Sequence, residues 1–410
     1  MPDTFFTNYK IAQKYDIAPA TVQSWITKAV KGELNLEIGE NEGRMKIKDT
    51  NQNKQQLLIL SQKASKYDRH RENTMRVQVN SELYELLNPV QVTKLIKGLR
   101  SGEVPLKLAY LGKGVDFWNS FYEKTKQSTS YTAKATYDYF IRTQFEYILS
   151  KFYDEFDKPQ KINVVDLGAG NGDPIVPLLK GLDERGLLNA YIALDISEGL
   201  LNLIDKTLAE NNLSHIQFQK IVCDFEDGMP ELELAQFNQG ERTVVPSLYV
   251  AFGGQIQNNE TFDQLHIIHN IRYVMYKQDR LLIWNSYHDK KSNPDYPAFE
   301  HSQIYDFLTW LPNMLGITNQ LYTPVFEYDP IDHKRWYGLK LNSNLEIEFT
   351  ERNLTVELKK DTILCVWKHR REDNQNVTDL ADKSREIALS LMLKHEKFHK
   401  TSDWLCSLAN

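Results

Sequence analysis

The sequence is poor in cysteine, has no long apolar run and carries no strong excess of either charge. Its three cysteines stand far apart among 410 residues, which argues against a disulfide framework or a thiolate metal site and favours a reducing, cytoplasmic setting. No apolar stretch approaches the ~20 residues that cross a bilayer. The first ten residues lack the basic and then apolar layout of a signal peptide. We therefore expect neither a secreted nor a membrane-spanning protein.

The charge is small overall but unevenly distributed along the chain. The formal net charge is −6, so the surface as a whole is not a cation suited to nucleic acid. Residues 1–76 carry 13 basic and 9 acidic side chains, a balance of +4, and the remainder carries 36 against 46, a balance of −10. A change of sign together with a change of composition marks a domain boundary. A chain of this length has room for two or three domains.

Two short helical patterns begin the chain. Tyr9–Tyr15 has helical spacing of apolar positions, and Pro19 suits the first turn of a second helix over Ala20–Ile26. Leu34–Ile38 and Met45–Ile47 can form a two-stranded wing. This order resembles the small winged helix-turn-helix domains of the MerR/excisionase type. The resemblance implies that the second helix offers four residues to a DNA major groove: Thr21, Gln23, Ser24 and Lys28. Because +4 is a modest charge for phosphate binding, a DNA partner and a protein partner both stay open.

The sequence predicts a buried strand and a glycine-rich loop from Ile162 onward. Ile162–Leu167 is a short apolar run, typical of a parallel strand covered on both faces. It leads into three glycines spaced GxGxG, at Gly168, Gly170 and Gly172, and then into a helical pattern from Ile175. Glycines at this point let a ligand approach the backbone at a helix N-terminus. The spacing differs from the GxGxxG of dinucleotide enzymes, and neither a P-loop lysine nor a metal motif such as HExxH is present.

Acidic residues follow the next two strand patterns. Asp195 ends the apolar run from Tyr191, where a carboxylate can accept hydrogen bonds from both hydroxyls of a ribose. Asp224 and Phe225 follow a third strand, where they can bind the amine and cover the face of an adenine. Further strands and a helix alternate up to Trp284. Alternation of this kind predicts an α/β fold with a doubly wound, Rossmann-like sheet and a ligand at the carboxyl ends of its strands.

This order of glycine loop, acid and Asp-Phe pair resembles the class I S-adenosylmethionine (SAM)-dependent methyltransferases. Residues 90–370 are similar to one family within that class, the histidine-specific N-methyltransferases that include the ergothioneine-pathway enzyme. The resemblance implies S-adenosyl-L-methionine as the cofactor. The matched motifs imply these cofactor-binding residues: Asp166, Gly168, Ala169, Gly170, Asn171, Asp195, Ile196, Ser197, Asp224, Phe225, Phe252 and Gly253.

The same resemblance indicates where a methyl acceptor binds. Tyr110 and Asn258 fall on family positions, the second on an asparagine that contacts the amino acid substrate, and Tyr305 is a further orienting candidate. The family reads imidazole with a Glu and a Ser, but these positions fall here on Val366 and Lys368. Since a site rejects a substrate that leaves polar groups unpaired, histidine itself is not the expected acceptor. We expect a small amine or amino-acid-like acceptor.

The domains follow from these segments. We expect a helix-turn-helix-like module and linker over 1–76, a helical substrate lid over 77–155, the SAM-binding core over 156–290 and an α+β substrate domain over 291–410. The last of these ends in an amphipathic helix over 377–400. The predicted function is methyl transfer from SAM to nitrogen. The alternative is a DNA-binding regulator whose methyltransferase-like body senses SAM.

Overall fold

The protein is described here from a computed structural model. The structure describes residues 5–126 except 16, 18, 42 and 73, residues 145–150 except 147, and residues 161–252 except 231 and 233–244. It also describes residues 256, 258–286, 302–329, 334–370, 387–394 and 401–408. No helix in this part of the chain is long and apolar enough to span a membrane.

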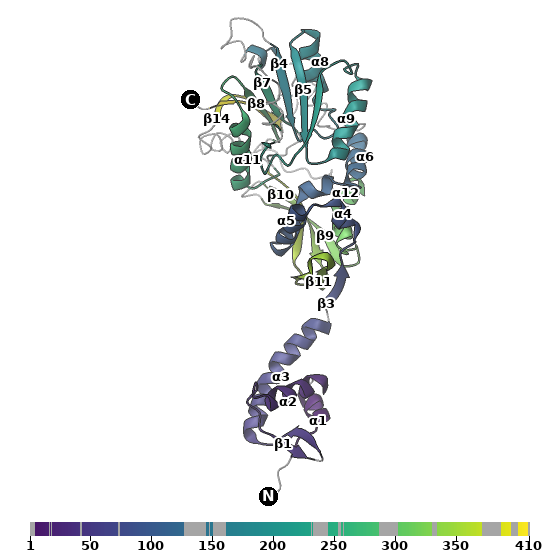
Figure 1. Cartoon of the computed structure of the whole chain (residues 1–410), viewed down its shortest axis with the longest axis vertical. Helices are drawn as coiled ribbons and strands as arrows, with labels where there is room; N and C mark the ends of the chain where they lie inside the picture. Colours follow the sequence, from purple (N-terminus) through teal and green to yellow (C-terminus); the bar gives the residue numbers. More distant parts are fainter. Residues whose placement is uncertain are drawn as a thin grey trace.

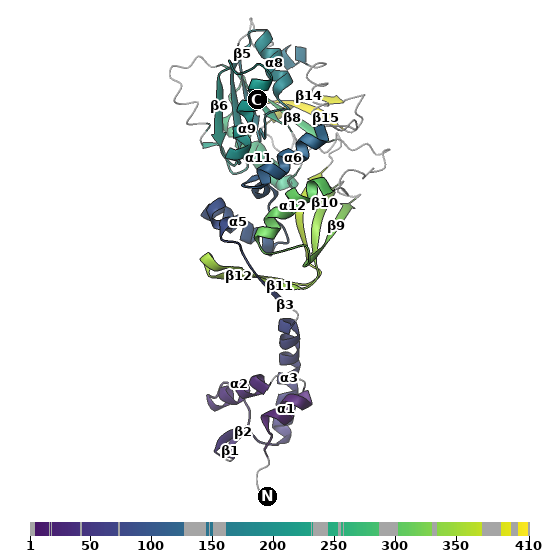
Figure 2. The same cartoon turned by 90° about the vertical axis from the view of Figure 1, so that its right-hand side faces the viewer.

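The N-terminal module contains the two helices and the strand pair that the sequence indicates. Helices α1 (Asn8–Tyr15) and α2 (Pro19–Val30) are followed by an antiparallel pair, β1 (Ile38–Asn41) and β2 (Arg44–Ile47), and by the long helix α3 (Asn51–Glu72). Its small core is apolar: Ile11, Val22, Trp25, Ile26, Ile47 and Leu57. Both views show this module apart from the rest of the chain, to which α3 connects it (Figures 1 and 2).

A second region combines helices from before the central sheet with strands from after it. Strand β3 (Thr74–Gln78) pairs in parallel with β11 (Asn344–Phe349), about 270 residues later in the sequence. Strand β12 (Leu354–Leu358) completes this three-stranded sheet, and β9 (Tyr322–Asp329), β10 (Lys334–Leu341) and β13 (Ile363–Arg370) form another. The helices of this region are α4 (Glu82–Leu86), α5 (Pro89–Arg100), α6 (Gly114–Lys126) and α12 (Ser302–Met314), with the 3₁₀ helices η1 (Leu106–Tyr110) and η2 (Thr350–Arg352).

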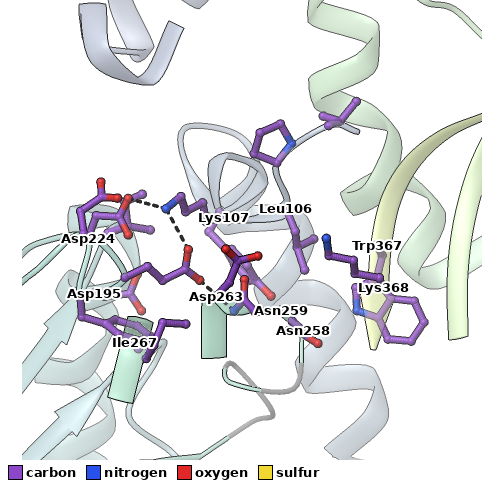
Figure 3. A pocket seen from close by; sticks show the side chains of 18 of the residues that line it. Leu106, Lys107, Asp195, Asp224, Asn258, Asn259, Asp263, Ile267, Trp367 and Lys368 are labelled. Atoms are coloured by element: carbon purple, nitrogen blue, oxygen red, sulfur yellow. Dashed lines mark hydrogen bonds and ion pairs between the residues drawn. The ribbon is translucent and has the colours of Figure 1, made fainter. Parts of the chain in front are cut away.

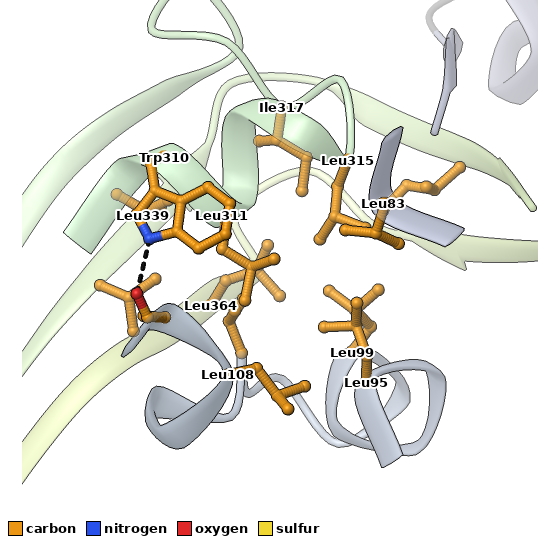
Figure 4. Packing of buried hydrophobic residues seen from close by; sticks show 14 of the residues in the cluster. Leu83, Leu95, Leu99, Leu108, Trp310, Leu311, Leu315, Ile317, Leu339 and Leu364 are labelled. Atoms are coloured by element: carbon orange, nitrogen blue, oxygen red, sulfur yellow. Dashed lines mark hydrogen bonds between the residues drawn. The ribbon is translucent and has the colours of Figure 1, made fainter. Parts of the chain in front are cut away.

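One apolar core holds this second region together. Side chains from α5, η1, α12, β10 and β13 meet in it (Figure 4), among them Leu99, Leu108, Leu311, Leu339 and Leu364. Each is essentially inaccessible to solvent, and burying such a side chain contributes roughly 1.5–3 kcal/mol. The indole N–H of Trp310 also donates to the backbone carbonyl of Ala109 at 2.8 Å. These contacts fix η1 and the start of α6, and both lie beside the cavity described below.

The central sheet has seven strands in the order β14-β15-β8-β7-β4-β5-β6. Five are parallel, as the sequence predicts: β4 (Ile162–Leu167), β5 (Leu188–Asp195), β6 (Phe218–Val222), β7 (Ser247–Ala251) and β8 (Arg280–Ser286). Apolar cores lie on both faces. Helices α8 (Val176–Glu184) and α9 (Glu198–Glu210) contribute to one of them, and α11 (Thr261–Val274) contributes to the other.

The predicted C-terminal helix over 377–400 is wrong for the residues that the structure describes there. Residues Ile387–Lys394 form strand β14, and Thr401–Leu408 form β15, which pairs antiparallel with β8. The sequence IALSLMLK alternates apolar residues with a period of two from Ile387 to Leu393, which favours a strand. The expected helix rested on Leu380, Ile387 and Leu391, whose wide spacing also suits a helix face. Both strands thus extend the central sheet.

Candidate functional site

A cavity of about 360 Å³ opens at the carboxyl ends of the parallel strands. The loops after β4, β5 and β6 line one end, and η1, α11 and β13 line the remainder. Figure 3 shows Asp195 and Asp224 at one end, Trp367 and Lys368 at the other, and Asn258 and Asn259 between them. This is the edge of the sheet at which doubly wound folds bind ligands. The cavity therefore joins the nucleotide-type motifs to the predicted acceptor residues.

The glycine loop approaches the cavity through backbone that only glycine adopts readily. Gly168, Gly170 and Gly172 have φ values of +69°, +56° and +71°, which lie in the left-handed region. A Cβ on Gly170 would lie 3.2 Å from the indole of Trp118. A side chain at Gly170 would therefore crowd Trp118, and the loop presents backbone to the cavity at Gly168 and Gly170.

Asp195 is a buried carboxylate held in a fixed orientation. One of its oxygens accepts the N–H of Gly170 and the other accepts the N–H of Ser197, each at 2.9 Å. Burial raises the pKa of Asp195 to about 6, against the lowering effect of these backbone donors. Each oxygen keeps further acceptor capacity. Two neighbouring hydroxyls on a ligand can therefore bind to it at once.

Asp166 lies at the end of β4 and is buried against Tyr191. The Tyr191 hydroxyl donates to its carboxylate at 3.0 Å. Burial raises the pKa of Asp166 to about 7, Tyr191 lowers it, and the nearby charge of Asp195 raises it again. Asp166 is not among the residues that line the cavity. It is buried two residues before Gly168.

Asp224 at the end of β6 lies in a cluster of acids and lysines. Its carboxylate is 2.7 Å from the ammonium of Lys107 and 3.5 Å from that of Lys94. Lys107 also pairs with Glu226 at 2.8 Å, and Lys94 with Asp227. Burial raises the pKa of Asp224, and the charge of Lys107 opposes this rise. Burial alone would lower the pKa of Lys107, but Glu226 and Asp224 raise it, so Lys107 stays charged.

The other end of the cavity holds Asn258 beside an aromatic pair. The Nδ1 atom of His369 lies 3.0 Å from the Oδ1 atom of Asn258, and the ring of Trp367 stacks on His369 with an interplanar angle of 2°. Burial lowers the pKa of His369 to about 4, so its imidazole is neutral at pH 7. The ammonium of Lys368 pairs with Glu103 at 3.0 Å. Asn258, Trp367 and Lys368 line the cavity at this end.

The structure gathers many, but not all, of the predicted site residues around the cavity. Tyr110 also lines it, and burial raises the pKa of its phenol, as do the charges of Asp195 and Glu226. Eight predicted residues line the cavity: Tyr110, Gly168, Gly170, Asp195, Ile196, Asp224, Phe225 and Asn258. Six others do not line it: Asp166, Ala169, Asn171, Ser197, Phe252 and Tyr305. The Tyr305 hydroxyl is instead hydrogen-bonded to that of Tyr322 at 2.7 Å. Gly253 lies outside the described residues.

Sequence reasoning missed three residues of the cavity wall. Trp118 stacks on Tyr122 and meets Tyr110 edge-on, and Lys107 and Trp367 also line the cavity. Lys107 and Trp118 flank Tyr110 within one short segment, so their spacing from that tyrosine was the available signal. Among the described residues, no group of three or more His, Cys, Asp or Glu side chains is placed to hold a metal ion.

Comparison with known proteins identifies the family of this chain. Residues 92–405 match the family described as "Histidine-specific methyltransferase, SAM-dependent". A 4-dimethylallyltryptophan N-methyltransferase (easF) from Claviceps fusiformis is 31% identical over 155 residues, which is 37% of this chain and 39% of that protein. Its counterpart from Epichloe festucae var. lolii is 28% identical over 171 residues, which is 41% of this chain and 45% of that protein. The chain thus spans less than half the length of these curated relatives.

Solved structures give weaker similarities. An S-adenosylmethionine-dependent methyltransferase from Clostridium acetobutylicum ATCC 824 has 11% identity and a TM-score of 0.37, covering 72% of this chain and 99% of that one. Magnesium protoporphyrin IX methyltransferase from Synechocystis PCC 6803 has 9% identity and a TM-score of 0.38, covering 74% and 97%. The family match covers most of the chain and includes every described part of the cavity wall. The chain therefore belongs to the histidine-specific, SAM-dependent methyltransferases, with S-adenosyl-L-methionine as its cofactor.

Proposed function

We propose that this protein transfers a methyl group from SAM to the nitrogen of a small amino-acid-like acceptor other than histidine. The observation that carries the proposal is the cavity itself, which runs as one continuous space from Asp195 and Asp224 to Asn258 and Trp367. Two relatives are named for N-methylation of 4-dimethylallyltryptophan, a substituted amino acid. Their names support an acceptor of that general kind.

The cofactor roles follow from the chemistry at each strand end. Asp195 accepts both ribose hydroxyls, because its oxygens are already oriented by backbone N–H groups. Asp224 accepts the exocyclic amine of adenine, and Phe225 covers the purine face. Gly168 and Gly170, which line the cavity without side chains, face the methionine portion. Five further residues take supporting positions behind this surface or beside the transferred methyl: Asp166, Ala169, Asn171, Ser197 and Phe252, with Gly253 next to the last.

The remaining residues need to align the acceptor rather than activate it strongly. The bound cofactor supplies a methyl group that is already activated as a sulfonium. The acceptor amine must be neutral and its lone pair must point at that methyl, an alignment worth several orders of magnitude in rate. Asn258 and Tyr110 orient the acceptor in this proposal. Tyr110 stays a neutral phenol because burial raises its pKa, so it donates or accepts a hydrogen bond without carrying charge.

The acceptor end of the cavity favours an apolar or aromatic side group. Val366 and Lys368 occupy the positions at which the family reads imidazole, and Lys368 is paired with Glu103. Leu106 and the indole of Trp367 also line this end. Histidine would leave its imidazole N–H without a suitable acceptor on Val366. A substituted indole such as that named for the relatives suits this wall better.

A panel of acceptors tests the proposal. The full chain is incubated with SAM and with L-tryptophan, 4-dimethylallyl-L-tryptophan, L-tyrosine or L-histidine, and methylated products are measured by mass spectrometry. We expect methylation of an aromatic amino acid, little methylation of histidine, and a loss of about tenfold or more in kcat/KM for Asn258→Ala. Efficient methylation of histidine would contradict the proposed acceptor. Absence of transfer to every amine tested, with SAM bound, would favour a SAM-binding sensor instead.

A second proposal concerns the N-terminal module, which we infer contacts DNA through α2. The observation that favours it is the division of this helix into a buried face of Val22, Trp25 and Ile26 and an exposed polar face that includes Ser24 and Lys28. A gel-shift titration of the full chain with duplex DNA at low salt, repeated with Lys28→Glu, tests it. No shift at low salt would remove DNA as the partner and leave a protein partner.

A further inference from the structure

Lys107 connects two parts of the cavity that the sequence motifs treat separately. It comes from η1, before the central sheet, yet its ammonium pairs with Asp224 at 2.7 Å and with Glu226 at 2.8 Å, in the loop after β6 (Figure 3). Its side chain is 22% exposed, so solvent screens these pairs only in part. An ammonium placed between two carboxylates holds both at fixed positions. Lys107 thus connects the second region to Asp224, the carboxylate proposed to bind adenine.

The same contacts continue toward the acceptor end. The Nδ2 atom of Asn259 donates to the Oε1 atom of Glu226 at 3.3 Å, and Asn259 follows Asn258 shortly before α11 begins. The backbone carbonyl of Glu226 accepts the side-chain amide of Asn270 on α11 at 2.8 Å. A chain of hydrogen bonds and ion pairs therefore runs from Asp224 through Lys107 and Glu226 to the residue beside Asn258.

We propose that Lys107 is a positioning residue that aims the Asp224 carboxylate at the exocyclic amine of the cofactor's adenine and ties it to the acceptor loop through Glu226 and Asn259. This inference rests on the proposed function, because it uses the adenine role of Asp224. It adds that selectivity for adenine depends on a lysine outside the nucleotide-binding motifs. Asn258, which directly precedes Asn259, is then held at a fixed position relative to the bound cofactor.

Charge is the physical reason for this role. Asp224 lies close to Glu226 and Asp227, whose charges disfavour its ionised form, and Lys107 and Lys94 face it from the other side. Without Lys107 only Lys94 offsets the repulsion between these acids, so Asp224 takes up a proton at higher pH or turns away. Two further titratable residues, Asp263 and His266 of α11, line the same cavity. An ionised carboxylate accepts from the adenine amine but repels a carbonyl at the same position.

Calorimetry on the full chain tests the proposal without knowledge of the acceptor. S-adenosyl-L-homocysteine and S-inosyl-L-homocysteine are titrated into the wild-type protein, Lys107→Met, Lys107→Arg and Lys97→Met. The inosine compound carries a carbonyl in place of the amine. Lys97 is an exposed lysine on α5 and serves as the matched control for loss of one charge. Circular dichroism and thermal unfolding establish that each variant is folded.

We expect Lys107→Met to weaken the adenosine compound by about tenfold or more, the size of a charge-assisted hydrogen bond, and to reduce the preference for adenosine over inosine. Its affinity also falls more steeply than that of the wild type between pH 8 and pH 6, because Asp224 gains a proton. Lys107→Arg retains the preference, and Lys97→Met changes neither property. A loss that is equal for both compounds, or an unchanged affinity, overturns the proposal. Failure of the wild type to bind either compound would instead overturn the proposed cofactor site.

Discussion

At the scale of single residues, the site depends on carboxylates that the fold keeps out of water. Asp195 is 6% exposed and retains its orientation through the N–H groups of Gly170 and Ser197. Burial disfavours its charged form, and this is why its pKa rises to about 6. In the proposed site, the hydroxyls of a ribose replace the lost water as hydrogen-bond donors. The proposal therefore couples cofactor binding to the ionisation of Asp195.

This coupling predicts how cofactor affinity depends on pH. Because the pKa of Asp195 is raised in the folded protein, the carboxyl holds a proton below about pH 6, and binding that needs the ionised form must release it. The affinity for S-adenosyl-L-homocysteine is expected to fall as the pH decreases through 6, by up to about tenfold per pH unit. Calorimetry between about pH 5 and pH 8 measures it.

The control for this prediction is Asp195→Asn, which has no carboxyl to titrate. Its affinity is expected to be lower throughout and less dependent on pH, the remaining dependence coming from Asp166, whose pKa is about 7, and from Asp224. The same raised pKa values act in the opposite direction on folding: these buried acids favour the folded state most below about pH 4, and that contribution is lost as the pH rises through 6 to 7. An identical pH dependence in wild type and variant would refute the role of Asp195.

How far the sequence predicts the site also depends on individual residues. Four residues could be recognised because each lies at or just after the end of an apolar strand, and this neighbourhood is visible in the sequence. They are Gly168, Gly170, Asp195 and Asp224. Lys107 was not assigned, since its partner Asp224 lies more than a hundred residues later. The predicted roles of Tyr110 and Asn258 came from a resemblance, and they stay predictions, as does that of Tyr305. Contacts between distant segments are what the sequence alone could not supply.

At the scale of secondary-structure elements, the start of α6 decides where Tyr110 and Trp118 lie. Gly114 begins this helix, and a Cβ there would come within 1.7 Å of the Ala109 carbonyl oxygen and 2.7 Å of the indole nitrogen of Trp310. The approach is possible only for glycine. The hydrogen bond from Trp310 to Ala109 and the position of η1 therefore require Gly114.

Replacement of that glycine is expected to destabilise the protein. Gly114→Ala forces α6 away from η1, at a cost of about 3 kcal/mol or more, beyond the usual range for overpacking. Urea unfolding measures the change in the free energy of unfolding. Gly186→Ala is the control, because Gly186 has a φ of +66° but no atom within 4 Å of the point that a Cβ would occupy, and it should cost only the roughly 1–2 kcal/mol of left-handed backbone. Equal losses for the two variants would mean that steric crowding at α6 is not important.

The elements were predicted well where periodicity was local and less well at the end of the chain. The parallel strands β4 to β8 are confirmed, because buried parallel strands give short apolar runs between helices. The helix expected over 377–400 was wrong in its described part. Residues Ile387–Lys394 form a strand there because they pair with β15, which in turn pairs with β8. The parallel pairing of β3 with β11 had no sequence signal, since it joins segments about 270 residues apart.

At the scale of the whole molecule, helix α3 connects the N-terminal module to the methyltransferase body, whose first strand is β3. This strand pairs with β11, and the N–H of Val79 bonds the carbonyl of Glu348 at 3.2 Å. The natural boundary of the body therefore lies before Thr74, close to the boundary at 76 that the charge balance indicates. Helix α3 leads away from this boundary to the module (Figure 2).

This boundary predicts the effect of two truncations. A chain that begins at Thr74 keeps β3 and is expected to bind S-adenosyl-L-homocysteine with an affinity within about twofold of the full chain. A chain that begins at Asn80 loses β3, exposes the edge of β11 and should unfold at a temperature lower by roughly 4 °C or more. Calorimetry and thermal unfolding compare them. If the shorter chain were as stable as the longer one, β3 would not belong to the body.

The proposed account depends most on the way the carboxyl ends of the central sheet bind the cofactor. Calorimetric titration of S-adenosyl-L-homocysteine into the full chain and into Asp195→Ala tests this most directly. We predict one binding site in the wild type and an affinity about a hundredfold lower in the variant, as expected when two charge-assisted hydrogen bonds to the ribose are removed. Equal affinity in the two proteins would contradict the account.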